Sequence, residues 1–208
     1  TIKIYRITNR SQDAIDIYQR ALTQYEIEKD SAMILVAHQN IGVAYTYLDS
    51  LEGSLIHLDK AYEIAQKTNI ERDLPSLLNA YAEAYYECEQ DYKNARRYVI
   101  QAEELGLQYG NQEYLSKIYL LKSQIEGDDN MYKASIKSLN KGLEILDSTD
   151  RQDLKLDYYE QAAKVYQQSG QTKQSLSYLN RYVALYKDVQ ATEKVNAIAE
   201  AQTKYESV

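Results

Sequence analysis

The strongest constraint on this chain is a helical pattern that recurs about every forty residues. Each occurrence consists of a small residue, a larger residue four positions later, and a small or medium residue three positions after that. The occurrences begin at Ala14, Ser54, Ala95, Ser135 and Ser175, so the spacing is 40 or 41 residues. Offsets of four and three place the members of one occurrence on a single stripe of an α-helix. A constant period of this length predicts a repeat architecture.

Each stripe suits close packing, because its small residues let a second helix approach and its middle residue fills the gap. The stripes are Ala14, Tyr18 and Ala21; Ser54, Leu58 and Ala61; Ala95, Val99 and Ala102; Ser135, Leu139 and Gly142; and Ser175, Leu179 and Tyr182. A second helical pattern precedes four of them across a short polar break. Its members are Ile41, Gly42 and Tyr45; Tyr81, Ala82 and Tyr85; Leu121 and Ile125; and Ala162, Ala163 and Tyr166. The sequence therefore predicts pairs of helices joined by short turns.

The turn-forming residues favour an all-α fold. Seven Gly and one Pro in 208 residues are too few for the turns of β-hairpins or βαβ units. Gly127 and Gly170 lie in polar breaks and are predicted to end helices in the left-handed conformation. Pro75 falls in the first turn of its predicted helix, where a missing N–H costs nothing. The expected helices span residues 11–29, 31–48, 51–69, 74–88, 91–109, 112–126, 130–147, 151–168, 171–187 and 190–206.

Two sets of residues resemble the tetratricopeptide repeat (TPR) signature. They are Gly42, Tyr45, Ser54, Leu58 and Ala61, and Ala163, Tyr166, Gly170, Ser175 and Leu179. The resemblance covers nearly the whole chain and implies a right-handed superhelical α-solenoid of about four and a half TPR-like helix pairs with a C-terminal capping helix. The period exceeds the ~34 residues of an ordinary TPR, which implies longer helices or longer turns. We expect a leading half-repeat at 1–30, four repeats at 31–188 and a capping or connector helix at 189–208.

The C-terminal segment carries a second resemblance. Residues 193–200, Glu-Lys-Val-Asn-Ala-Ile-Ala-Glu, followed by Lys-Tyr-Glu at 204–206, are similar to the end of the TPR sensor region of Bacteroidetes membrane histidine kinases and TPR-linked transcriptional regulators. The resemblance implies an extracytoplasmic (periplasmic) sensor domain that meets the membrane only through a segment after residue 208. The simpler alternative is an amphipathic capping helix, which leaves a cytoplasmic location open. Its apolar face would carry Ala191, Val195, Ile198 and Tyr205.

No residues form a recognisable catalytic or metal-binding pattern, so we expect no enzyme activity, no metal and no cofactor. His38 and His57 lie 19 residues apart on different predicted helices, without a metal-binding motif around either. We interpret both as ordinary surface or interface histidines. Cys88 is the only cysteine, and the neighbouring Glu87 and Glu89 are expected to raise its pKa rather than activate it.

Two further classes of ligand are disfavoured. The acidic cluster at 128–130 lacks the alternating spacing of a calcium loop and is predicted to form a turn and helix cap. The net charge of −7 is a poor match for a nucleic-acid backbone. Binding of a protein or peptide is the function that remains.

The concave surface of such a solenoid is lined by the first helix of each pair. Residues one and four positions after the small residues, and one turn earlier, are expected to face it. They are Gln39, Val43, Thr46, Tyr47, Asn79, Glu83, Tyr86, Tyr119, Ser123, Glu160, Lys164 and Gln167. For the tyrosines, packing in the core is an equal alternative. Val43 and Glu83 stand where TPR domains that clamp a C-terminal carboxylate rely on Asn and Lys or Arg, so that ligand is disfavoured.

Three functions fit these observations. We favour the sensor domain of a membrane-bound signalling protein, in which a bound ligand changes the superhelical twist and the last helix transmits the change. The second is a free-standing TPR adaptor or chaperone without an output domain. The third is an intracellular peptide-responsive transcriptional regulator, although no helix-turn-helix fits among the repeats. A homodimer through the Tyr-rich faces remains open in each case.

Overall fold

The computed structural model describes residues 2–109, 112–147, 149 and 151–206, with side chains described for residues 10–192 of these ranges and for Lys194. Over these residues the chain is helical and contains no strand. The helices are α1 (Ile2–Glu28), α2 (Ser31–Tyr47), α3 (Leu51–Thr68), the 3-10 helix η1 (Glu71–Asp73), α4 (Leu74–Glu89), α5 (Tyr92–Tyr109), α6 (Gln112–Asp128), α7 (Tyr132–Leu146), α8 (Gln152–Gln168) and α9 (Thr172–Glu206). The predicted all-α solenoid is confirmed.

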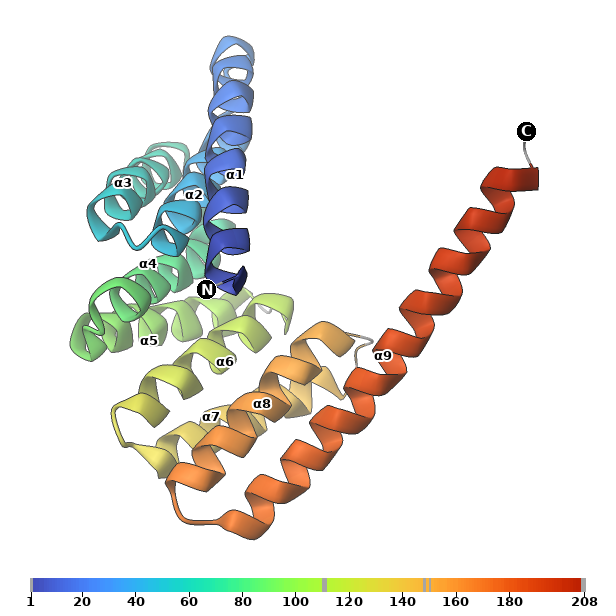
Figure 1. The fold of residues 1–208 in the computed structure, drawn as a ribbon. Helices are drawn as coiled ribbons and strands as arrows, with labels where there is room; N and C mark the ends of the chain where they lie inside the picture. Colours follow the sequence, from blue (N-terminus) through green and yellow to red (C-terminus); the bar gives the residue numbers. More distant parts are fainter. Residues whose placement is uncertain (1, 110–111, 148, 150, 207–208) are drawn as a thin grey trace.

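The helices stack as four pairs behind a leading helix (Figure 1). The pairs are α2–α3, α4–α5, α6–α7 and α8–α9, and α1 packs against α2. The first helices of successive pairs also touch, α2 with α4, α4 with α6 and α6 with α8. No contact of comparable extent joins α3 to α5 or α5 to α7. The first helices therefore lie on the inner, concave side of the stack, and the second helices form its outer side.

The predicted stripes hold the helices of each pair together in the middle of the chain. Leu58, Val99 and Leu139 are at most 1% exposed. Leu58 lies directly over Gly42, where a Cβ would come within 2.8 Å of its side chain. Sequence periodicity identified this packing correctly, because the contacts depend only on which side of each helix a residue occupies.

The small serine of the stripe adds a hydrogen bond between the two helices of a pair, buried in the third pair and half-buried in the fourth. The Ser135 hydroxyl donates to the carbonyl oxygen of Ser123 at 2.7 Å. The Ser175 hydroxyl makes the equivalent bond, to the carbonyl oxygen of Ala163 at 2.9 Å. In both cases the donor lies 12 residues after the acceptor. The repeat thus conserves its internal geometry as well as its pattern.

The turns within the pairs also follow the repeat period. Asp49, Gln90, Asn130 and Gly170 all have positive φ, at 59°, 52°, 59° and 76°. The prediction is confirmed for Gly170, but it is wrong for Gly127, which lies inside α6. A Cβ on Gly127 would be 3.1 Å from Val165, so this glycine permits close approach of α8 rather than ending a helix.

The acidic cluster at 128–130 only partly follows its predicted role. Asn130 forms the turn, but the residue preceding α7 is Met131, which makes no side-chain cap. Asp128 instead accepts hydrogen bonds from Lys164 and Tyr86, and Asp129 pairs with Arg96. These carboxylates tie neighbouring helices together. Pro75, in contrast, lies in the first turn of α4 as predicted.

A buried tyrosine packs the fourth helix pair against the third. Tyr158 on α8 is 0% exposed, and its hydroxyl donates to the carbonyl oxygen of Ser116 on α6 at 2.5 Å. Its ring passes over Gly142 on α7, where a Cβ would overlap the phenol. Glycine at this position of the stripe is therefore required by a contact between repeats.

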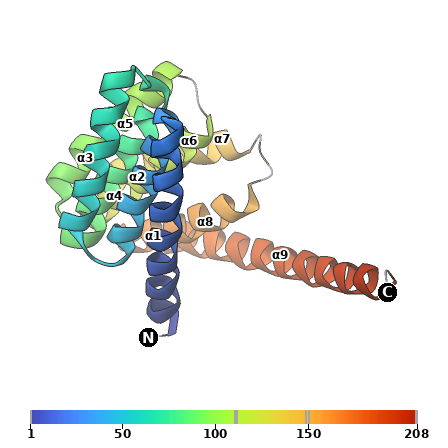
Figure 2. The ribbon, with the colours of Figure 1, turned by 90° about the horizontal axis from the view of Figure 1, so that it is seen from above.

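The last helix departs from the predicted pattern. The segments expected at 171–187 and 190–206 form one continuous helix, α9, whose C-terminal part extends away from the stack (Figures 1 and 2). Leu179, the middle residue of the fifth stripe, is 48% exposed, because no described helix follows to cover it. Of the face predicted for a capping helix, the side chains of Val195, Ile198 and Tyr205 lie outside the described residues. No described helix combines the length and apolarity needed to cross a membrane.

Candidate binding groove

The first helices of the four pairs enclose an open groove with a volume of about 810 Å³ on the concave side. The lining is Tyr47, Asn79, Glu83, Glu87, Lys117, Leu120, Leu121, Gln124, Leu154, Asp157, Glu160, Gln161 and Lys164. These residues come from α2, α4, α6 and α8, which the contacts between successive first helices hold side by side. A groove of this shape suits an extended segment better than a small enclosed ligand.

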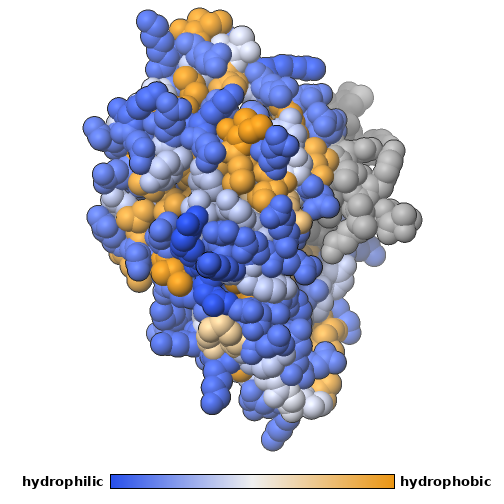
Figure 3. All heavy atoms as spheres, turned by 90° about the vertical axis from the view of Figure 1, so that its left-hand side faces the viewer, coloured by the Kyte–Doolittle hydropathy of each residue, from blue (hydrophilic) through white to orange (hydrophobic). Residues whose placement is uncertain are grey.

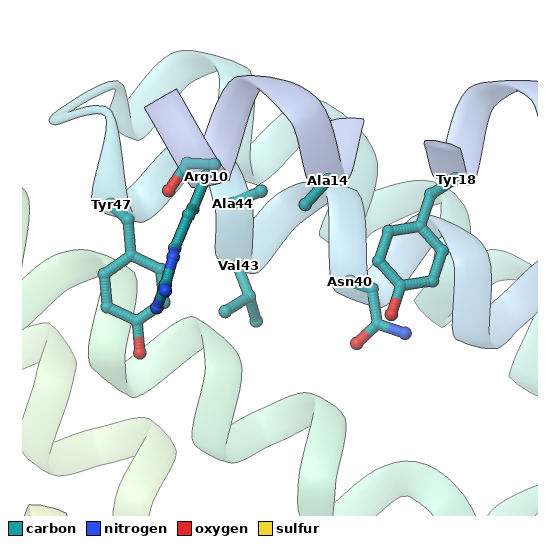
Figure 4. A pocket seen from close by; sticks show the side chains of 8 residues that line it. Arg10, Ala14, Tyr18, Asn40, Val43, Ala44 and Tyr47 are labelled. Atoms are coloured by element: carbon teal, nitrogen blue, oxygen red, sulfur yellow. The ribbon is translucent and has the colours of Figure 1, made fainter. Parts of the chain in front are cut away.

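Five of the residues predicted to face the groove do line it. They are Tyr47, Asn79, Glu83, Glu160 and Lys164. Val43 instead lines a neighbouring pocket of about 510 Å³ between α1 and α2. Figure 4 shows Val43 and Ala44 in its floor, with Arg10 beside Tyr47 at one end and Tyr18 near Asn40 at the other. Because Tyr47 lines both spaces, the pocket continues the groove toward α1.

Three predicted groove residues lie in the interior instead. Thr46 is 4% exposed and Ser123 is 0% exposed, and each is hydrogen-bonded to the serine of its repeat's stripe. The prediction failed for Thr46 because a residue four positions after Gly42 lies on the same face as Gly42, toward the partner helix. Tyr119 is 4% exposed and packs toward the outer side, where the Lys141 ammonium lies 5.0 Å from its ring centre.

The other three predicted residues are not part of the groove lining. Gln39 donates a hydrogen bond to Ser76 at 2.7 Å, which links α2 to α4. Tyr86 donates to Asp128 at 2.6 Å, which links α4 to α6. Gln167 is exposed near the end of α8 and is not part of the lining.

Several lining residues were missed in the sequence analysis. Extending the predicted face of each helix by one turn would have found them. Glu87 lies one turn after Glu83, and Asp157 lies one turn before Glu160. On α6, the lining residues that were not predicted include Lys117 and Gln124. This helix lacks the small–Tyr signature from which the groove-facing positions were derived on the other helices.

The groove is electrostatically unbalanced toward negative charge. Burial is the main cause that raises the pKa values of Glu83, Glu87 and Asp157. The Tyr47 hydroxyl donates to Glu83 at 3.1 Å and partly offsets that effect. The Tyr47 pKa is itself raised, first by the charge of Glu83 and to a smaller extent by Asp157. Carboxylates of α4 and α8 therefore both act on the Tyr47 hydroxyl.

The two lysines of the groove form their ion pairs with other acids, although the charge of Lys164 acts to lower the pKa of Glu87. Lys164 is 2.8 Å from Asp128, and Lys117 is 3.3 Å from Glu113, and neither of these acids belongs to the lining. The groove therefore presents carboxylates whose charge no described lysine or arginine pairs with. This excess charge is the main chemical feature of the site.

The two histidines meet between α2 and α3, which the sequence did not indicate. Their Nδ1 atoms lie 3.0 Å apart, and Tyr45 stacks on His57 with ring centres 5.6 Å apart. His38 is 6% exposed, so the expectation of an interface histidine is confirmed for it, but the pairing is new. No cluster of three metal-ligating side chains occurs in the described part of the chain.

This pair predicts a loss of stability in acid. Burial, His57 and Lys60 lower the pKa of His38 to about 4, and burial and Lys60 lower that of His57. Because the folded-state pKa values lie below the unfolded value, the contribution is complete above pH ~6.5 and is lost as pH falls toward the folded values. Replacing His38 with Gln should cancel about 1 kcal/mol of this loss after allowance for solvent screening.

The measurement is the Tm of both proteins at about pH 7 and about pH 5. The fall in Tm from the higher to the lower pH should be a few degrees smaller for the His38→Gln protein than for the wild type. An equal fall in Tm for both proteins would mean that protonation of the histidine pair does not destabilise the folded state.

Cys88 is an inert thiol. Burial, followed by Asp49, Glu87 and Glu89, raises its pKa to about 11. A thiol with such a pKa is almost fully protonated at neutral pH and is a poor nucleophile. The predicted direction of the shift is confirmed, with burial as the larger cause.

Two solved structures with a similar fold are TPR-like repeat proteins. A candidate kinesin light chain from Podosopora anserina, crystallised as nearly identical TPR-like repeats, has a TM-score of 0.62 and 14% sequence identity, covering 90% of this chain and 93% of that one. A Gln-to-Met variant of it has a TM-score of 0.64 and 15% identity over the same shares. No family model and no curated protein matches the sequence. The chain therefore has the fold of a TPR-like repeat scaffold.

Proposed function

We propose that this chain is a non-catalytic scaffold that binds a segment of a partner protein along its concave groove. One observation carries the proposal: the groove runs without interruption along α2, α4, α6 and α8 and is open to solvent. Its lining mixes Tyr, Leu, amide and charged side chains, which suits an extended peptide. The TPR-like fold supports this use, since such repeats generally serve protein interaction.

An unbiased peptide selection tests this proposal. A phage-displayed peptide library is selected on the wild-type protein, and the enriched peptides are measured on two variants. Gln124→Trp places a bulky side chain in the groove, whereas Asn140→Trp places it at an exposed position on α7. We expect Gln124→Trp alone to weaken binding at least about tenfold, or ~1.4 kcal/mol. Equal binding to both variants would locate the peptide site elsewhere.

We further propose that the scaffold is the sensor or interaction domain of a signalling or transcriptional-regulatory protein, located outside the cytoplasm. The proposal rests on the resemblance of residues 193–206 to Bacteroidetes sensor regions and on α9, a long helix suited to carry a change in superhelical twist. Sequencing the intact gene beyond Val208 tests it. An apolar span of ~20 residues there supports a membrane sensor. A polar continuation or a stop codon favours the free-standing adaptor, with a cytoplasmic location open.

A candidate surface for the proposed homodimer lies on α9. Leu176, Leu179, Val183 and Tyr186 are 41–55% exposed and follow the three- and four-residue steps of a paired helix. We propose that two copies pair through this stripe. Sedimentation equilibrium should then give a dimer that Leu179→Glu converts to a monomer, and a monomeric wild type would exclude the proposal.

A further inference from the structure

The groove contains more negative charge than the protein itself compensates. Four carboxylates, those of Glu83, Glu87, Asp157 and Glu160, belong to its lining, and no described lysine or arginine forms an ion pair with any of them. They lie on α4 and α8, with the two lysines of the lining already engaged by other acids. An uncompensated cluster facing a groove attracts a cationic partner and repels an acidic one.

These carboxylates are also partly desolvated. Burial is the largest cause of the raised pKa values of Glu83, Glu87 and Asp157. A carboxylate that has lost part of its hydration gains more from a cation than one in bulk water does. Lys or Arg side chains of a bound segment would supply that cation without any rearrangement of the groove.

A second observation points to a polypeptide as the source of the charge. Asn79 lines the groove between the acidic residues and α2, and its Oδ1 atom is buried without a hydrogen-bond partner among the described residues. Because an unsatisfied buried acceptor costs free energy, a rotation of the Asn79 amide that turns this oxygen toward a donor in the groove would be favourable. Every residue of an extended peptide except proline has a backbone N–H that can serve as this donor.

The pocket between α1 and α2 adds an apolar end to the groove. Its wall consists mainly of Ala14, Tyr18, Val43 and Ala44, and Tyr47, with Arg10 beside it, connects it to the acidic region. Figure 4 shows these side chains directed into a common space. A linear ligand that passes Tyr47 would therefore meet apolar walls on one side and carboxylates on the other.

We propose that the groove selects an extended peptide segment that carries Lys or Arg side chains next to an apolar anchor residue. The inference rests on the proposed function and specifies its ligand. The basic side chains lie along α4 and α8, and the anchor occupies the pocket between α1 and α2. Acidic peptides are excluded by the same charges.

Charge-neutral variants of equal size test the proposal. The groove variant combines Glu87→Gln, Asp157→Asn and Glu160→Gln, none of which belongs to the core. The control combines Glu52→Gln, Glu104→Gln and Glu144→Gln on the outer helices α3, α5 and α7, so that the net charge changes equally. Figure 3 shows the outer face that carries α3 and α5, where hydrophilic side chains predominate.

Binding is measured by fluorescence polarisation with three synthetic peptides that share a Leu-Leu end. One continues with alternating Gly and Lys, one with Gly and Glu, and one with Gly and Ser. We expect only the Lys peptide to bind, with an affinity that falls about tenfold or more in the groove variant and changes less than about twofold in the control. Raising the salt concentration should weaken this binding.

The possible outcomes separate the two proposals. If library peptides bind in a way that Gln124→Trp abolishes, but the Lys peptide does not bind or the two charge variants behave alike, the scaffold function stands and the basic ligand is excluded. If Gln124→Trp affects no peptide, the groove itself is not the binding site. If spermine binds as tightly as the Lys peptide, the charge is confirmed but the apolar anchor is overturned.

Discussion

Replacing Gly142 with Ala should lower the Tm by roughly 10 °C, although Ala is the better helix former. On helix propensity alone, the substitution would stabilise α7 by about 1 kcal/mol. In the structure, however, the added methyl group would overlap the phenol of Tyr158. That ring is 0% exposed and tied to Ser116, so it cannot move aside without breaking a buried hydrogen bond. Overpacking and the lost bond together should cost about 2–4 kcal/mol net.

Thermal denaturation followed by circular dichroism is the measurement. Asn140→Ala, at an exposed position on the same helix, is the matched control and should change stability by less than about 0.5 kcal/mol. In the Tyr158→Leu background, Gly142→Ala should instead be stabilising by up to about 1 kcal/mol, because the clash is gone and the helix propensity of Ala remains. A higher Tm for Gly142→Ala in the wild-type background would show that α7 and α8 are not in close contact there.

The second prediction with a large effect concerns the middle residue of the stripe, where the same Leu→Ala substitution is made in two different repeats. In the monomer, at a dilution that sedimentation shows to be monomeric, Leu58→Ala should destabilise the protein by about 3 kcal/mol, and Leu179→Ala by less than about 1 kcal/mol. Leu58 is 0% exposed and belongs to the cluster that includes Leu35, Leu77 and Tyr81, so its removal leaves a cavity. Leu179 is 48% exposed and leaves none.

Urea denaturation of both variants would provide the comparison, with the midpoint converted to free energy at a constant m-value. Equal losses would contradict the exposure of Leu179. At concentrations where the proposed dimer forms, the loss for Leu179→Ala should be larger, because the second copy covers Leu179.

The candidate groove was only partly predictable from the sequence. Tyr47, Asn79, Glu83, Glu160 and Lys164 were found because helical spacing from a small, partner-facing residue gives the opposite face. The same rule failed for Thr46, which lies above Gly42 on the buried face. On α6, where no small–Tyr signature marks the register, the two predicted residues are buried.

The histidine pair illustrates a different limit. His38 and His57 belong to separate helices, and nothing in their sequence spacing shows that their rings meet. Their contact depends on the rotation of α2 and α3 about their axes, which the whole interface sets. The charge imbalance of the groove is of the same kind, because it depends on which carboxylates find lysines in space.

The sequence by itself determined the all-α repeat, its period, the turns and the stripe that packs each helix against its partner. These features are local: a residue's face on a helix follows from its spacing to neighbours within one turn, and its tolerance of a positive φ follows from its own side chain. Tertiary structure alone decided that Gly142 accommodates Tyr158, that Leu179 is exposed, and that α4 and α8 present unpaired carboxylates to one groove. These features depend on how successive pairs rotate against one another, and that rotation is set by contacts between residues about forty positions apart in the chain.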